Sequence, residues 1–354
     1  MKISFILLAL LLQFCNPFEK NKKDDKKPLI FAALAVVTAA SSSNTASRST
    51  DTITSKYNSY APTFTATGNG IYEIVPSVTA AYAAGSLKQG FIDDGVKMAN
   101  FARYLAFLPD DLVSDSALNS NGQYGAVLLS ASSFSHTPSK PADMDTTFYN
   151  EGYSATSSSN IAAGFSTLHS SIQSGYMRDS DTGNMSLVGH RRWILNPQLK
   201  KVGFGFAGSS YSLMKVFDKS RTETFDYSYT AWPAEGFFPT EFFSSTDPWS
   251  LTLNPKKYKT PTSSSAKVTL TRSSDGKSWT LSSADSTASS TSEYFTVNTG
   301  GYGVSNCIIF RPKTTDITSL ENDSYTVNVS GIQDISGNST TVSYTVKFFK
   351  MGIK

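Results

Sequence analysis

The chain has 354 residues, a formal net charge of +3, 17% charged and 12% aromatic residues, and two cysteines. This length accommodates two domains, each with its own core, and the composition excludes a disordered chain or a coiled coil. The basic run 20–27 is interrupted by two aspartates, so a nucleic-acid partner has little electrostatic support. Two cysteines are too few for a disulfide framework.

The amino terminus indicates export. Lys2 precedes the apolar stretch 3–14, which ends at Cys15. This arrangement resembles a bacterial lipoprotein signal, in which Cys15 becomes the acylated first residue, although Phe14 is bulky where a small residue is normal. We therefore expect residues 1–15 to be a signal peptide, of the lipoprotein type or otherwise an ordinary export signal. The protein would lie in the cell envelope or at the surface, associated with the membrane through a lipid anchor, or alternatively be secreted.

Residues 16–56 are predicted to form a tether. The apolar run 29–40 is too short to span a bilayer, which takes roughly 20 apolar residues. It can serve instead as an export segment or as a membrane-proximal tether. Residues 41–56 are rich in serine and threonine and nearly devoid of large apolar side chains, which is typical of a flexible linker.

Three helices are predicted next. Apolar spacing predicts a helix over 91–108, which Pro109 ends. A second helix is expected over about 116–130, begun by Asp115, and a third over 161–177. The apolar positions that share a face are Phe91, Met98 and Leu105 in the first helix, and Phe165, Leu168, Ile172 and Tyr176 in the third.

Strand patterns follow Pro197. Residues 202–206 alternate apolar residues with glycine, and 211–217 are their expected pairing partner. The glycines leave one strand face open to close approach by a helix or a ligand.

Beyond Trp249 the chain is expected to be all-β. About seven short alternating runs within about 100 residues predict an immunoglobulin-like sandwich over 249–354. Cys307 lies in one of these runs and is expected to be a buried apolar residue.

Several short motifs follow one another in a specific order. They are Asn100-Phe101-Ala102-Arg103, Ser135-His136-Thr137-Pro138, Ser159-Asn160-Ile161-Ala162, Gly189-His190-Arg191-Arg192 and Val202-Gly203-Phe204-Gly205. On these residues, the segment from about 82 to 208 resembles a bacterial member of the CAP superfamily (cysteine-rich secretory proteins, antigen 5 and pathogenesis-related 1). The resemblance implies an α+β protein: an α-β-α sandwich within 57–248, including an amino-terminal extension, followed by the immunoglobulin-like domain.

The resemblance also implies a surface cleft that holds two histidines and two acidic residues, where a divalent metal such as zinc can bind. His136 and His190 match the two histidines and are the candidate metal ligands. Ser159 stands where the family has an acidic residue before Asn160, so these four residues are the expected cleft residues. The other acidic position has no clear match, although three carboxylates lie nearby in the sequence: Glu151, Asp179 and Asp181.

These residues favour binding over catalysis. A catalytic zinc needs typically three protein ligands, and hydrolysis needs a base or nucleophile in reach. We therefore assign no catalytic residue and expect a non-catalytic module for a macromolecular partner or a lipid-like, apolar ligand. The alternatives are a metal-dependent hydrolase that uses the His136/His190 cleft and a purely structural or adhesive envelope protein. In the structural interpretation, each neutral imidazole ties a loop to the sheet.

The residues around His190 carry further expectations. Arg191 and Arg192 are expected to form salt bridges with Asp179 or Asp181. The run 179–184 is interpreted as a polar turn, because the closing position of a calcium loop, which needs a glutamate, falls on His190.

Overall fold

The computed structural model describes residues 48–208 and 210–353. The predicted signal peptide, Cys15 and residues 16–47 of the predicted tether lie outside the described residues. In the part of the chain that the structure describes, no helix is both long and apolar enough to cross a membrane. The described residues all belong to one compact unit.

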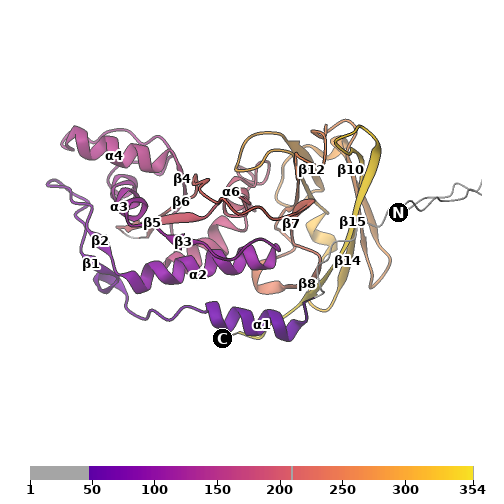
Figure 1. Ribbon diagram of the computed structural model, residues 1–354, viewed down its shortest axis with the longest axis horizontal. Helices are drawn as coiled ribbons and strands as arrows, with labels where there is room; N and C mark the ends of the chain where they lie inside the picture. Colours follow the sequence, from indigo (N-terminus) through magenta and orange to yellow (C-terminus); the bar gives the residue numbers. More distant parts are fainter. Residues whose placement is uncertain (1–47, 209, 354) are drawn as a thin grey trace, which may run out of the picture. The chain divides into compact units, whose positions relative to one another are not determined.

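The helices lie mainly in the first half of the described chain (Figure 1). They are α1 (Thr50–Tyr60), α2 (Gln89–Leu105), α3 (Ser116–Ala131), α4 (Thr146–Thr156), α5 (Leu168–Ser170) and α6 (Gly189–Ile194). A π-helical turn, Ser171–Tyr176, follows α5. Short 3-10 turns occur at Gly68–Ile71, Thr240–Phe242, Ser283–Asp285 and Thr314–Asp316. Helices α2 and α3 confirm the two predicted helices, whereas α4 has no counterpart among the predicted elements.

The first helix differs from its prediction. Helix α1 lies partly within the predicted tether, and Ser49 caps its amino terminus by accepting a hydrogen bond from the backbone of Thr52 at 3.1 Å. Ile53 and Tyr57, one helical turn apart, are buried. This pair gives the helix an apolar side that packs against α2. The tether prediction is therefore corrected for residues 50–56, where two apolar side chains are enough to hold a polar sequence against the core.

The third predicted helix begins too early. Residues 161 and 162 belong to strand β4 (Ser159–Ala162), where Ile161 pairs with Leu213 and Ala162 with Ser212. The helical part starts only at Leu168. Pairing with a neighbouring strand overrides the helical spacing of the apolar residues, because the sheet satisfies the backbone polar groups of β4.

A four-stranded sheet forms the centre of this region, in the order β3-β5-β6-β4. Its other strands are β3 (Val113–Ser114), β5 (Lys201–Ala207) and β6 (Tyr211–Lys215). Strand β5 alternates phenylalanine and glycine. The Phe206 ring packs edge-on against Phe91 of α2 with ring centroids 5.5 Å apart, whereas a Cβ atom on Gly205 would lie 2.0 Å from the carbonyl oxygen of Gly122 in α3. Helix α2 therefore covers one face of β5 and α3 the other (Figure 1).

Two further sheets make up the carboxy-terminal region. One has the order β11-β10-β14-β15-β8 and the other β12-β13-β9-β7. The strands are β7 (Tyr229–Trp232), β8 (Gly236–Pro239), β9 (Trp249–Leu253), β10 (Lys267–Arg272), β11 (Ser278–Leu281), β12 (Tyr294–Asn298), β13 (Cys307–Arg311), β14 (Ser324–Gln333) and β15 (Ser339–Phe349). A separate pair joins β1 (Tyr72–Ile74) to β2 (Ser86–Leu87).

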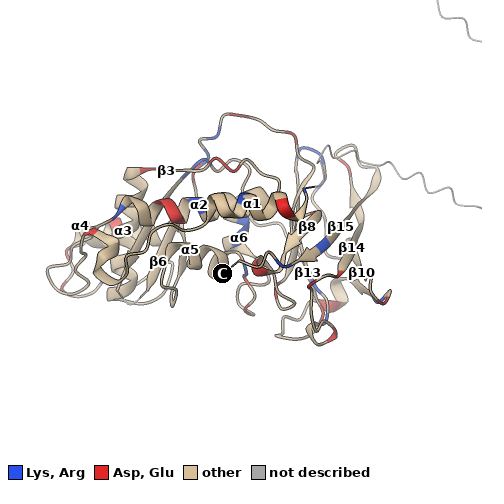
Figure 2. Ribbon diagram, turned by 90° about the horizontal axis from the view of Figure 1, so that it is seen from below, with Lys and Arg blue, Asp and Glu red and all other residues tan. Residues whose placement is uncertain are grey.

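The core of the β-rich region lies between its two sheets. Trp249 of β9 contacts Tyr325 and Phe348, which belong to the opposite sheet, with ring centroids 5.9 Å away in each case. Cys307 is a free, fully buried thiol, as predicted. Strands β7 and β8 also belong to these sheets, although they precede Trp249 in the chain. Each has only four residues, which is too short for an alternating pattern to be recognised in the sequence. Basic and acidic residues are interspersed along the described elements rather than gathered on one face (Figure 2).

Candidate functional site

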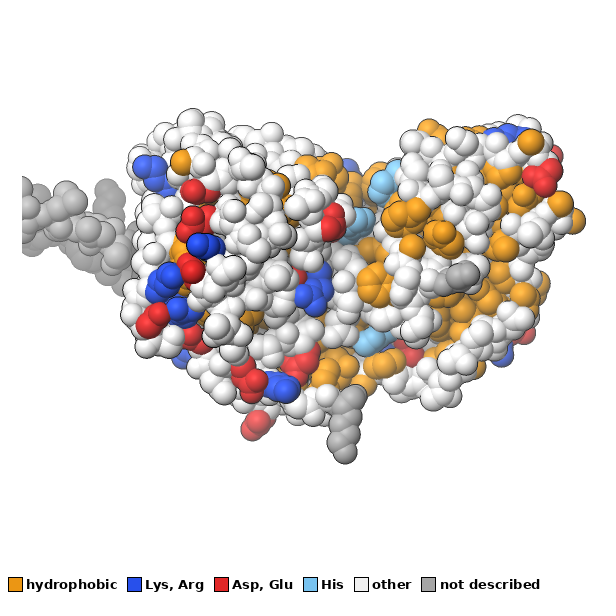
Figure 3. Space-filling model, turned by 180° about the vertical axis from the view of Figure 1, so that it is seen from behind, with side chains coloured by type: hydrophobic (Ala, Val, Ile, Leu, Met, Phe, Trp, Pro, Cys, Tyr) orange, Lys and Arg blue, Asp and Glu red, His pale blue; other side chains and the backbone are white. Residues whose placement is uncertain are grey.

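A cleft of about 530 Å³ opens beside α6, and we call it the histidine cleft. Residues 134–136, 161–163, 174–176 and 178–181 line it together with His190. Figure 3 shows a notch on one face of the molecule in which histidine side chains are visible beside hydrophobic ones. The cleft brings His136 and His190 to the same space, although 53 residues separate them in the sequence.

The imidazole of His190 is held by a carboxylate. Its Nδ1 atom lies 2.7 Å from Oδ1 of Asp179, whose side chain is only 1% exposed. Because an ionised carboxylate can only accept, Nδ1 carries the proton and Nε2 is left for the cleft. Burial opposes charge on the imidazole, but the charge and hydrogen bond of Asp179, aided by Asp181, outweigh it and raise the pKa of His190. The ring of Tyr176 stacks on the imidazole with centroids 5.6 Å apart.

His136 is anchored in the same way by a different group. Its Nδ1 atom lies 2.9 Å from the carbonyl oxygen of Thr156, at the end of α4. The hydroxyl of Thr156 donates back to the carbonyl of His136 at 3.1 Å. A carbonyl can only accept, so Nδ1 is the donor here too. Both histidines therefore have Nδ1 engaged by the protein and Nε2 available as an acceptor.

Ser159 and Asn160 lie behind the histidine cleft rather than in its wall. Both are buried in β4. The Ser159 hydroxyl donates to the carbonyl of Ala155 at 2.7 Å, and the Asn160 side-chain amide donates to the carbonyl of His190 at 2.9 Å. Asn160 therefore positions α6, and neither side chain is among those that line the cleft.

Asp179 is the functional residue whose role the sequence analysis missed. It lies near His190 in the sequence, but it was expected to pair with an arginine. The backbone at Asp179 has a φ of +46°, a left-handed conformation that aspartate tolerates better than most residues. Its second oxygen accepts a hydrogen bond from the backbone N–H of Arg191 at 3.1 Å. In the sequence, the only signal for this role was an aspartate that is followed by a turn.

The expected salt bridges of Arg191 and Arg192 are wrong. Asp181 accepts hydrogen bonds from the backbones of Gly183 and Asn184 at 3.0 and 3.1 Å. It thereby forms the predicted polar turn and has no arginine partner among the described residues.

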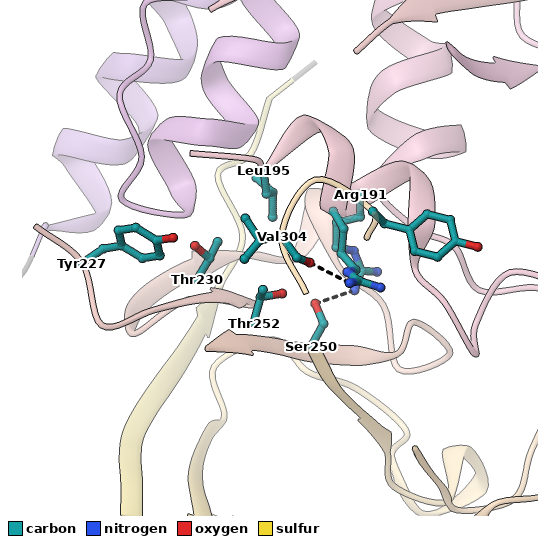
Figure 4. Close-up of a pocket in the computed structure, with 9 residues that line it drawn as sticks. Arg191, Leu195, Tyr227, Thr230, Ser250, Thr252 and Val304 are labelled. Atoms are coloured by element: carbon teal, nitrogen blue, oxygen red, sulfur yellow. Dashed lines mark hydrogen bonds between the residues drawn. The ribbon is translucent and has the colours of Figure 1, made fainter. Parts of the chain in front are cut away.

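Arg191 instead joins α6 to the β-rich region. Its guanidinium is fully buried and donates to the carbonyls of Met177 and Pro248 at 2.8 and 2.7 Å, and to the hydroxyl of Ser250 in β9 at 3.2 Å. A further bond reaches the carbonyl of Arg178 at 2.6 Å. Figure 4 shows Arg191 pointing toward Ser250. A planar group with five donors suits this cluster of acceptors.

Arg192 makes a second connection to the same region. It donates to the side chain of Asn298 at 2.8 Å and to the carbonyls of Gly300 and Val304 at 2.6 and 2.7 Å. Its guanidinium also lies 5.1 Å from the centroid of the Tyr302 ring. The two arginines therefore hold α6, and with it His190, against the β-rich region.

The candidate metal ligands in the histidine cleft are its two imidazoles. Among residues 48–208 and 210–353, no group of three or more His, Cys, Asp or Glu side chains is arranged to hold a metal ion. His136 and His190 could supply two nitrogen ligands, one fewer than a catalytic zinc typically uses. Both oxygens of Asp179 already accept hydrogen bonds, from His190 and from the backbone of Arg191.

Comparison with known proteins gives one match. Residues 110–217 match the family model described as CAP, the cysteine-rich secretory protein family. The matched segment runs from the loop before α3 to the end of β6 and contains both His136 and His190. Neither the curated proteins nor the solved structures gave a match.

Proposed function

We propose that the chain, whose residues 110–217 match the CAP family model, is an exported, cell-envelope protein of the bacterial type that binds a ligand in its histidine cleft without transforming it. In this proposal Cys15 carries a lipid anchor, and the β-rich region is an immunoglobulin-like domain that presents the CAP domain at the surface.

The observation that carries the proposal is the pair of imidazoles anchored through Nδ1 in one cleft. Each offers an Nε2 acceptor whose direction the protein has already set, which lowers the ordering cost of binding. The cleft also has apolar lining residues, among them Phe134, Ile161 and Phe165, and Phe134 is 52% exposed. Apolar walls with a few placed polar groups are typical of small-molecule sites. A lipid-like ligand with one polar end fits this combination.

Two ligand classes respond differently to pH. Protonation of His190, whose pKa is raised, turns Nε2 from an acceptor into a charged donor. A fatty acid, with its carboxylate, should therefore bind more tightly as the pH falls toward about 6, whereas a long-chain alcohol should not.

The test is a fluorescent polyene alcohol, whose hydroxyl can donate to Nε2, titrated into the full chain and into the variants H136A, H190A and the double variant. The double variant should weaken binding by about tenfold or more, because it removes both acceptors that the ligand's hydroxyl can reach. The third histidine supplies the matched control, since His169 lies outside the cleft, so H169A should bind as the wild type does. Wild-type affinity in a folded double variant would overturn the proposal.

The alternative of a metal-dependent hydrolase has one observation in its favour. Histidines that bind metals usually donate their other N–H to a carboxylate or a backbone carbonyl, and His190 and His136 do so. Zinc titration followed by an esterase and peptidase assay separates the two functions. Zinc-dependent turnover that H136A and H190A both abolish would establish the hydrolase and displace the binding proposal.

The lipid anchor is tested separately from the cleft. Expression of the full chain with a labelled fatty acid should give a labelled protein, and C15A should abolish the label because it removes the acylated thiol. Label that persists in C15A would rule out the anchor while leaving the cleft proposal untouched.

A further inference from the structure

A second cavity, of about 400 Å³, lies between α4 and the segments that precede α2 and α4. It shares no lining residue with the histidine cleft. We call it the aromatic pocket, because three rings line it: Tyr82, Tyr124 and Phe148.

The three rings form one contiguous wall. The rings of Tyr124 and Phe148 have centroids 4.7 Å apart at 55°, and those of Tyr82 and Phe148 lie 6.1 Å apart at 42°. All three side chains are half-buried, so each ring packs on its neighbours and still borders the cavity. They come from three separate segments, and their planes are tilted relative to one another.

The rest of the aromatic pocket is negatively charged. Asp143, Asp145 and Glu151 line it, and none of its lining residues is a lysine or an arginine. Figure 2 shows basic and acidic residues interspersed along other elements, so the absence of a basic lining residue makes this a local concentration of acidic groups. Lys215, whose charge acts on Glu151, is buried and donates to the side chains of Asn121 and Ser158.

Each carboxylate is held in place by a bond within the protein. Asp143 accepts a hydrogen bond from the hydroxyl of Tyr82 at 2.9 Å. Asp145 caps α4 through its Oδ1 atom, and Glu151 accepts from the side chain of Asn121 at 3.0 Å. The three carboxylates therefore place negative charge at fixed positions around the rings. Part of their hydrogen-bonding capacity is already used within the protein.

We propose that the aromatic pocket binds a quaternary ammonium group, of the trimethylammonium kind found in choline. Such a cation has no N–H to donate, so it needs ring faces and nearby negative charge rather than free acceptors. A primary ammonium is compact and strongly hydrated, so it would lose more hydration than a trimethylammonium group and cover less of the ring surface. The site is separate from the histidine cleft and does not depend on the function proposed for it.

Calorimetric titration of the full chain with choline chloride tests the proposal. The neutral isostere 3,3-dimethyl-1-butanol, which has the same shape without the charge, should bind at least about tenfold more weakly, because it lacks the cation–π attraction. Methylamine should also bind more weakly than choline. Equal binding of choline and its neutral isostere, or tighter binding of methylamine, would overturn the proposal.

Variants locate the site. F148L keeps an apolar side chain of similar size and removes the ring, so it should weaken choline binding by about tenfold. Y82F keeps the ring and loses only the hydroxyl, and it should bind within about threefold of the wild type. D143N changes charge at an exposed position and should weaken binding most at low salt. The proposal would also be overturned if a folded F148L variant bound choline as the wild type does. The same result for a folded D143N/Y124L double variant would overturn it as well.

Vesicles distinguish the two sources of the same head group. Retention on phosphatidylcholine vesicles, but not on phosphatidylglycerol vesicles, with release by free choline, assigns a lipid head group to the aromatic pocket. Binding of choline without retention on vesicles assigns a free solute. Binding of neither choline nor phosphatidylcholine removes the site.

Discussion

Asp179 controls the protonation of His190, and this gives a prediction for D179N. The pKa of His190 is raised in the folded chain, above an unfolded value of about 6.5. The pair therefore stabilises the fold fully below about pH 6.5 and loses this contribution as the pH rises through the folded pKa. The wild type should exceed D179N in free energy of unfolding by more at about pH 5.5 than at about pH 8.5. Asparagine suits the left-handed backbone at this position but keeps only one of the two acceptor oxygens, so it is the change of the difference with pH that reports the charge.

Urea unfolding at the two pH values makes this measurement. A difference between wild type and D179N that stays constant with pH would show that the carboxylate supports only the loop and leaves the charge of His190 unaffected.

Lys215 gives a prediction of the opposite sign. Burial lowers its pKa to about 8, against the attraction of Glu151. Folding therefore costs free energy whenever Lys215 is charged. This cost is full below about pH 8 and disappears as the pH rises to the pKa of the unfolded state, about 10.4. The free energy of unfolding of the wild type, relative to K215M, should rise between about pH 7.5 and pH 10. A flat difference across this range would mean that the ammonium is solvated.

At the scale of elements, the contact between β5 and α3 depends on glycine. A Cβ atom on Gly205 would lie 2.0 Å from a backbone oxygen of α3, and backbone cannot yield as the end of a side chain does. We expect G205A to cost roughly 3 kcal/mol of unfolding free energy, as severe overpacking does. G301A is the matched control, since nothing lies within 4 Å of its Cβ position. Equal stability of the two variants in thermal melts would contradict the close approach.

The start of α3 depends on Asp115. Its carboxylate accepts the backbone N–H groups of Ala117 and Leu118 at 3.0 and 3.2 Å and also pairs with Lys201. We expect D115A to lower the free energy of unfolding by about 1 kcal/mol through loss of the cap. D115N keeps a capping oxygen and removes the charge, so it should stay near the wild type. Urea unfolding measures both, and comparable losses would assign the effect to the pair with Lys201.

At the scale of the whole molecule, α6 carries His190 on one side and the two arginines on the other. Arg191 and Arg192 place their guanidinium groups on acceptors of the β-rich region. Removing them leaves buried carbonyls without donors, at about 1–3 kcal/mol for each unsatisfied group. We expect the wild type to unfold in one calorimetric transition and R191M/R192M to unfold in two, as the β-rich region separates from the region that matches the CAP family model. A single transition in the variant, at the melting temperature of the wild type, would show that the two arginines do not join the two regions.

Some features were accessible from the sequence because they depend on neighbours along the chain. The apolar spacing of α2 and α3, the cap at Asp115 and the glycine alternation of β5 are local patterns, and the structure confirms each. The ordered motifs also pointed to the CAP family, which the match over 110–217 supports. The burial of Ile53 and Tyr57 was not accessible, because it depends on α2 rather than on the composition of the tether.

The candidate site shows the same division. His136 and His190 could be named from their motifs, and the order of those motifs indicated a shared cleft. Only the tertiary structure decided which group holds each imidazole, because Asp179 and the carbonyl of Thr156 become partners through a left-handed turn and a helix end. It also decided that Arg191 and Arg192 face the β-rich region. The sequence determined the local elements and the resemblance to the CAP family, since these are encoded in short-range patterns. Hydrogen-bond partners of buried polar groups were decided by the fold, since burial forces each donor to the nearest acceptor in space, wherever that acceptor lies in the chain.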